Sequence, residues 1–289
     1  MTRPGQGRIL AILALGLLPA NAAPSPGATA PRVAATSVFS LAGQPVQGGW
    51  LRGVAPPRTV VLRLDGASVS FAPDGAFFLA FDRDAKPGAT LEAVLADGRK
   101  VTEVLAVAPR AWRIERVNVP LRPPATPDAD YQRIRTAELA RIAAARTANS
   151  ASEGWRQRFI WPVRGRISGL FGSQRIYQGV PASYHSGTDV STGHSGTPFV
   201  APADGIVILA AESPFSLEGN LLMIDHGMGL NSAFLHGSKL LVKAGDSVRQ
   251  GQVIGLIGMS GRASGPHLHW SVKWHEARLD PMLLSGPMG

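Results

Sequence analysis

Cysteine is absent from the 289 residues of this chain. Its absence excludes disulfide bonds, thiol nucleophiles and zinc sites built from thiolates, so a metal ion here would need histidine and carboxylate ligands. Long runs of lysine and arginine are also missing, although the formal net charge is +9. We therefore expect no nucleic-acid partner. The spread positive charge is typical of a solvated surface, or of one that meets an anionic cell-wall polymer.

Uninterrupted helix-forming sequence is limited, because the chain has 33 glycines and 23 prolines. Both residue types mark turns, so we expect frequent turns, few long helices and a mainly β fold. The length suits one or two domains, and the 45% hydrophobic content suits a substantial core.

The first 22 residues have the pattern of a secretory signal peptide. Arg3 and Arg8 precede an apolar run at 9–18, and Ala20-Asn21-Ala22 fits a cleavage site. Ten apolar residues are too few to span a bilayer core about 30 Å thick, so we expect cleavage and no stable membrane span afterwards. A retained tether is the alternative. Residues 23–36 are predicted to be a flexible lead-in, and the mature chain is predicted to be periplasmic or extracellular.

Residues 37–120 have the pattern of a small all-β module. Apolar segments at 59–64 and 90–95 are each followed by an Asp-Gly pair, at 65–66 and 97–98. Asp-Gly between apolar segments is a strong hairpin signal. The module has no cluster of histidine and carboxylate residues, so we interpret it as a packing or anchoring module.

Residues 121–158 are predicted to be a proline-rich linker followed by a helix. Asp128 is the predicted N-cap of a helix over 129–148, which would serve as a linker or a lid. Its apolar side is expected to consist of Ile134, Leu139 and Ile142.

A strand-rich domain is predicted over residues 159–289. Dense glycine and alternating apolar residues favour strands at 159–163, 221–225, 240–246 and 252–258, separated by tight turns.

The chemistry of the chain is concentrated at its end, because all seven histidines follow residue 184. His267 and His269 are two residues apart, so they lie on one face of a predicted strand, and zinc is a common reason for histidines to converge. His185 and Asp189 form a second group. A catalytic zinc takes three protein ligands. His185, Asp189 and either member of the 267/269 pair supply them, and the other histidine then serves as a proton carrier.

The remaining histidines are less informative. His236 ends a predicted strand at 233–236 and is expected to flank the same site. His194, His226 and His275 lie in turns or near a strand end, so we interpret them as structural or solvated.

At three motifs in order, the sequence resembles the lysostaphin-type (LytM-domain) zinc metalloendopeptidases. The motifs are His185-Ser186-Gly187-Thr188-Asp189, Phe234-Leu235-His236 and Gly265-Pro266-His267-Leu268-His269. The resemblance runs from about residue 159 to 281. It implies a duplicated-hybrid-motif-like domain, with an antiparallel sheet folded into an open groove.

By this resemblance, one zinc ion is bound by His185, Asp189 and His269, and His236 and His267 are the catalytic histidines. The implied activity is hydrolysis of peptide cross-links in bacterial peptidoglycan. Family members often have Tyr-x-His-Leu where this chain has Phe234-Leu235-His236-Gly237, so a tyrosine hydroxyl is missing here.

Two other functions are compatible with parts of this pattern. Degenerate relatives that lack zinc ligands activate amidases, so a catalytically silent wall-binding regulator is the alternative. A lipoyl- or biotinyl-type carrier would need a modifiable lysine at the tip of a β-turn, and none is evident. The sequence leaves the oligomeric state open, and we favour a monomer.

The groove is expected to be walled by loops at about 173–184 and 211–219, with Tyr177 and Phe215 as candidate contacts to a peptide stem. Residues 37–149 resemble the extra domains that precede the catalytic domain in some secreted Gram-negative relatives. Some of those domains cover the groove, so a lid is a hypothesis for this segment.

Overall fold

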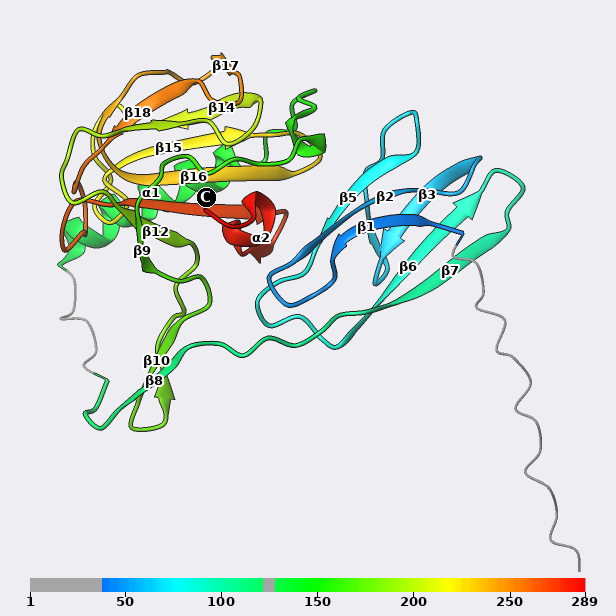
Figure 1. The fold of residues 1–289 in the computed structure, drawn as a ribbon, viewed down its shortest axis with the longest axis horizontal. Helices are drawn as coiled ribbons and strands as arrows, with labels where there is room; N and C mark the ends of the chain where they lie inside the picture. Colours follow the sequence, from blue (N-terminus) through cyan, green and yellow to red (C-terminus); the bar gives the residue numbers. More distant parts are fainter. Residues whose placement is uncertain (1–37, 122–127, 289) are drawn as a thin grey trace, which may run out of the picture. The chain divides into compact units, whose positions relative to one another are not determined.

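The computed structural model describes residues 38–121 and 128–288. The predicted signal peptide and lead-in, and the prolines at 123, 124 and 127, lie outside the described residues. Within the described ranges the fold is mainly β, as predicted (Figure 1). No helix in these ranges combines the length and the apolar character that crossing a membrane requires.

The amino-terminal strands form two antiparallel sheets that match the predicted hairpins. The predicted strand at 59–64 is present with those bounds, and Asp65-Gly66 and Asp97-Gly98 form turns after β3 and β6. One sheet consists of β1 (Ser40–Gln44), β2 (Trp50–Val54) and β5 (Ala76–Ala80), and the other of β3 (Thr59–Leu64), β4 (Ala67–Ser68), β6 (Gly88–Leu95) and β7 (Lys100–Ala106).

A small third sheet joins the end of this region to the later chain. Strand β8 (Ile114–Val117) pairs in parallel with β10 (Gln174–Tyr177), which pairs with β11 (Val180–Pro181). A segment ahead of the predicted linker therefore contributes a strand beside the predicted groove wall.

The largest sheet has ten strands, and its pairings are antiparallel. Strand β19 lies between β12 and β16, so it occupies an interior position. The strands are β9 (Arg166–Gly169), β12 (Thr188–Ser191), β13 (Pro198–Val200), β14 (Gly205–Ala210), β15 (Asn220–Asp225), β16 (Leu230–Leu240), β17 (Ser247–Val248), β18 (Val253–Ile257), β19 (Leu268–Trp274) and β20 (Ala277–Leu279).

Two predicted strands in this region are wrong. Residues 159–163 form no strand, because Pro162 has no N–H to donate and Ile160 N instead donates to Pro202 O at 3.0 Å. The chain after Leu240 forms a turn, in which the Asp246 carboxylate accepts a hydrogen bond from Lys243 N at 2.9 Å.

The predicted helix is α1 (Ala129–Ala145), and the Asp128 cap is confirmed, because its carboxylate accepts a hydrogen bond from Tyr131 N at 2.6 Å. The predicted apolar side is wrong in part. Ile134 and Leu139 are about half exposed. Ile142 packs beside a small buried cluster of Leu209, Phe215, Leu221, Met223 and Ala233.

Helix α1 is instead attached largely through a polar network. Glu138 is buried, and its carboxylate accepts hydrogen bonds from Ser216 N and Ser216 Oγ, both at 2.5 Å. Arg135 donates to Glu138 at 3.0 Å and to both carboxylate oxygens of Glu218 at 2.6 and 2.7 Å. An alternation of apolar residues cannot predict such a docking surface, because its partners lie about 80 residues later in the chain.

Arg52 on β2 links the first sheet to the segment around the 3-10 helix Gly154–Arg156. Its guanidinium donates to Trp155 O at 2.7 Å and to Gln157 O at 2.5 Å, and it lies 4.7 Å from the centre of the Trp50 ring. Burial lowers the pKa of Arg52 to about 10, which still leaves it charged at neutral pH.

Replacing Arg52 tests this link. We expect Arg52→Ala to lower the free energy of unfolding by about 2–3 kcal/mol. The substitution leaves two carbonyl acceptors without their charged donor and removes a cation–π contact. Urea unfolding measures the change. The control is Arg99→Ala, which removes an arginine from an exposed ion pair with Asp97 and should leave the unfolding midpoint unchanged. Equal effects of the two substitutions would contradict the role of Arg52.

Candidate metal centre

Strand β19 separates a core face from a polar face by simple alternation. Leu268, Trp270 and Val272 are buried in the core. His269 alternates with them and therefore points to the opposite face. Asp189 on β12 is its register partner, and His269 Nδ1 lies 2.8 Å from Asp189 Oδ1.

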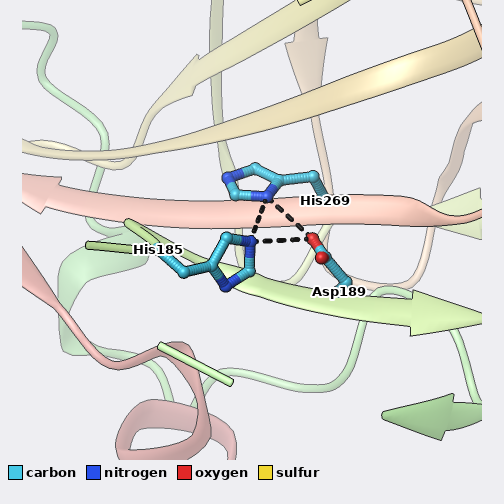
Figure 2. A group of neighbouring side chains, drawn as sticks. All are labelled: His185, Asp189 and His269. Atoms are coloured by element: carbon cyan, nitrogen blue, oxygen red, sulfur yellow. Dashed lines mark hydrogen bonds and ion pairs between the residues drawn. The ribbon is translucent and has the colours of Figure 1, made fainter. Parts of the chain in front are cut away.

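His185 completes a compact group with these two side chains (Figure 2). It lies ahead of β12, and its Nε2 is 3.1 Å from both Asp189 Oδ1 and His269 Nδ1. Tetrahedral ligands about 2.0–2.1 Å from a zinc ion stand about 3.3 Å from one another. The three observed separations, 2.8 to 3.1 Å, are within a few tenths of an ångström of that spacing.

The donor chemistry of the group fits a cation. His185 Nδ1 lies 3.1 Å from Leu170 O, so in the neutral ring this nitrogen carries the proton and Nε2 presents a lone pair. That lone pair, the carboxylate oxygen of Asp189 and Nδ1 of His269 face one point. A cation at that point would interact favourably with all three atoms.

The electrostatics of the group favour an ionised carboxylate. Burial raises the pKa of Asp189, but the close polar contacts with the His185 and His269 rings outweigh burial and hold it well below its usual range. Burial lowers the pKa of His269. For His185, burial acts in the same direction, but the hydrogen bond and charge of Asp189 outweigh it and raise the pKa.

Two glycines leave room for these side chains. A Cβ at Gly169 would lie 2.3 Å from Asp189 Oδ2. A Cβ at Gly187 would lie 2.6 Å from His269 Nε2 and 2.5 Å from Trp270 O. Both contacts are too short for real atoms, so the cradle requires glycine at these positions.

His236 and His267 lie next to the group. Their ring centres are 4.8 Å apart, and the His236 ring is 6.4 Å from that of His269. His267 Nε2 is 3.8 Å from Asp189 Oδ1. The structure therefore brings together all five residues singled out in the sequence.

Hydrogen bonds orient both of these histidines. His236 Nδ1 lies 2.9 Å from Ser260 O, and His267 Nδ1 lies 2.8 Å from Gly265 O. When neutral, each ring therefore donates from Nδ1 and presents a lone pair on Nε2. Burial lowers the pKa of His236, which favours its neutral form.

His236 occupies an unusual backbone position. Its φ is +67°, a left-handed value, at the point where β16 stops pairing with β19 and begins to pair with β18. Such a conformation costs about 1–3 kcal/mol and persists where surrounding structure enforces it. The sequence predicts the end of a strand here, whereas β16 continues through the bend.

The other three histidines lie apart from the group, as expected. His226 is fully buried, with Nδ1 2.8 Å from Asp204 O and Nε2 2.9 Å from Ser232 Oγ. His194 and His275 are exposed.

Two cavities adjoin the group of His185, Asp189 and His269, which we call the metal group. One, of about 850 Å³, is lined by His185 and Asp189 together with parts of the predicted 173–184 wall, including Tyr177. The other, of about 780 Å³, reaches His269 and is lined on one side by α1. The expected role of Phe215 is wrong, because this side chain is buried in the small cluster beside α1.

Several contributors to the site are not predictable from the side-chain motifs. Leu170 acts through its backbone carbonyl, which no side-chain motif reveals. Arg113 and Glu115 line the 850 Å³ cavity although they precede the linker, because β8 pairs with β10. The glycines at 169 and 187 are visible in the sequence. Only the packing of Asp189 and His269 against them shows that a larger residue would not fit.

Comparison with known proteins finds similarity between part of the chain and a described family. Residues 183–281 match peptidase family M23. Over 133 residues the chain is 36% identical to peptidoglycan DD-endopeptidase ShyA of Vibrio cholerae, and over 104 residues it is 39% identical to ShyB of the same organism. These alignments cover 46% and 36% of this chain.

The chain matches only part of those relatives, 30% of ShyA and 24% of ShyB. Similarity to a solved structure extends further. The crystal structure of a Pseudomonas aeruginosa protein assigned to peptidase M23 has a TM-score of 0.64 and 29% identity, and the alignment covers 84% of this chain and 96% of that one.

The glycine cradle can be tested by metal titration. We expect Gly187→Ala to weaken Zn²⁺ affinity about tenfold or more, because the added methyl group displaces His269. Competition with a chromogenic chelator measures the affinity. Gly88→Ala is the control, since its Cβ would meet Leu105 O at an ordinary 3.9 Å. Wild-type affinity in Gly187→Ala would contradict the crowding argument.

His226 makes stability depend on pH. Burial lowers the pKa of His226 to about 4, below its usual 6.5. As pH falls, His226 therefore gains a proton in the unfolded chain before it does so in the folded chain. The free energy of unfolding falls by up to about 3 kcal/mol between about pH 6.5 and about pH 4. Urea unfolding at pH 7.5 and pH 5 should show a smaller loss in His226→Gln than in the wild type. The same loss in both proteins would contradict this assignment.

Proposed function

We propose that the chain, whose residues 183–281 match peptidase family M23, is a zinc-dependent endopeptidase that hydrolyses peptide cross-links of bacterial peptidoglycan. The observation that carries the proposal is the convergence of two kinds of group. Three ligand atoms lie within 4.8 Å of one another, and two further histidines lie at their side. A cluster that only stabilised the fold would not need the two further histidines.

The ligands of the proposed zinc are His185 Nε2, Asp189 Oδ1 and His269 Nδ1. A bound zinc ion would lower the pKa of water in an open position to about 7 and polarise the peptide carbonyl. Leu170 O holds the His185 ring in its ligating orientation, and the strand register holds Asp189 opposite His269. The chain would thus hold the ion through three protein ligands.

The proposed proton carriers are His236 and His267. Each donates its Nδ1 proton to a backbone carbonyl, so Nε2 is free to accept a proton from water as a general base. Once protonated, the same nitrogen donates a hydrogen bond to the oxyanion or passes the proton to the leaving amine. Burial of His236 suits the base role, because it favours the neutral ring at neutral pH.

The relatives and the charge of the chain support the proposed substrate. Two relatives are named peptidoglycan DD-endopeptidases, so we propose that a DD-type cross-link is cut. A net charge of +9 suits an anionic wall polymer. Together with the predicted signal peptide, this substrate implies a periplasmic or extracellular location. We retain the predicted layout of a β module, a linker with a helix, and a metallopeptidase domain over 159–289.

Digestion of purified peptidoglycan sacculi tests the function. The wild-type protein should release cleaved cross-links, identified by mass spectrometry, and a chelator should abolish the release until Zn²⁺ is restored. His269→Ala should lose bound zinc and cleavage together, with activity reduced by at least about 10³-fold, because one of three ligands is missing.

The matched control is His194→Ala, which removes an exposed histidine outside the site and should retain both zinc and activity. Sacculi left intact by a zinc-loaded, folded wild-type protein would contradict the proposal. If that inactive protein stimulated a separate amidase, the chain would instead be a wall-binding regulator.

A further inference from the structure

A row of basic side chains lies on the same face of the sheet as the metal ligand His269. Along β19, His269, Ser271 and Lys273 alternate with buried core residues, so they share one face. All three line the 780 Å³ cavity. At about 3.4 Å per residue, Lys273 lies about 14 Å along the strand from His269.

Neighbouring strands extend this row sideways. Lys273 pairs with Arg278 on β20 and with Asn231 on β16, and register partners point to the same face. Arg146, just beyond α1, reaches over Asn231 and donates to its Oδ1 at 2.5 Å. Arg146, Lys273 and Arg278 all line the cavity, and we call them the cationic row.

The three positive charges of the cationic row share Glu276 as a nearby carboxylate, and Asp82 adds a second negative charge near Arg278. Among the described residues that line this end of the cavity, Glu276 is the carboxylate, and it lies 2.8 Å from Lys273 Nζ. Its side chain is 97% exposed, so this ion pair is weak. Asp82 accepts a hydrogen bond from Arg278 N at 2.9 Å, and the Arg278 guanidinium donates to Tyr184 Oη at 3.3 Å.

Placing like charges together has a cost that the native structure accepts. Like charges directly opposite each other in a sheet are destabilising. Burial, and then the charge of Arg278, lower the pKa of Arg146 to about 10. The acceptor of Arg146 is an uncharged amide, although an arginine fork is suited to a carboxylate. An anionic ligand would relieve this repulsion.

We propose that the cationic row is a subsite for a carboxylate of the substrate peptide, and that it selects acidic stems over neutral bridges. This inference rests on the proposed function. A peptide lying extended along β19 from the metal group would reach the row within about four residues of the scissile bond. Arg146 follows α1, so the helix region would contribute to substrate choice.

The experiment compares two matched substrates. Cross-linked muropeptide dimers are released from sacculi by a muramidase, and a second batch has its carboxyl groups converted to carboxamides. For the wild-type protein, kcat/KM should be higher for the native dimers. In Lys273→Gln and in Arg146→Gln, the ratio of native to amidated kcat/KM should fall about tenfold, mainly through KM. Using a ratio cancels any loss of folded protein.

Lys100→Gln is the matched control, because it removes one positive charge from an exposed pair with Glu92 on the amino-terminal sheets. It should keep the wild-type ratio. If the wild-type protein cleaves both batches equally, the subsite is wrong and the endopeptidase stands. If the ratio is unchanged in both test variants, or falls equally in Lys100→Gln, the assignment to this row is wrong. If neither batch is cleaved, the proposed function and this inference both fail.

Discussion

The pairing of β12 with β19 is the constraint on which the site depends. It places Asp189 opposite His269 on one face, while Leu268 and Trp270 anchor the other face in the core. A slip of one residue would turn His269 into the core and Leu268 toward the groove. Burial of these apolar side chains therefore fixes the register, and the register fixes the spacing of two of the three candidate ligand atoms.

The site is then completed from the backbone of distant segments. Leu170 O orients His185, and the carbonyls of Ser260 and Gly265 orient His236 and His267. Backbone acceptors are held by the sheet and its turns, so the imidazoles are positioned before any ligand arrives. Such preorganisation lowers the reorganisation cost of binding and of charge development.

Segments ahead of the M23 match take part in this architecture. Strand β8 joins β10 beside one cavity, and α1 lines the other. The helix is attached by the Arg135–Glu218 and Glu138–Ser216 contacts rather than by an apolar stripe. This charged docking holds α1 along one side of the 780 Å³ cavity. One cavity adjoins the metal group at His185 and Asp189, and the other adjoins it at His269.

Residue types and their spacing were enough to predict the mainly β class, the Asp-Gly hairpins, the Asp128 cap and the choice of five candidate residues, because these are local patterns. The folded chain was needed to show that Phe215 is buried and Ile134 exposed, that His236 lies in a left-handed bend, and that Arg146 reaches the row beyond His269. These features arise from pairings between segments far apart in the chain and from backbone carbonyls, and neither leaves a periodic signal in the side chains.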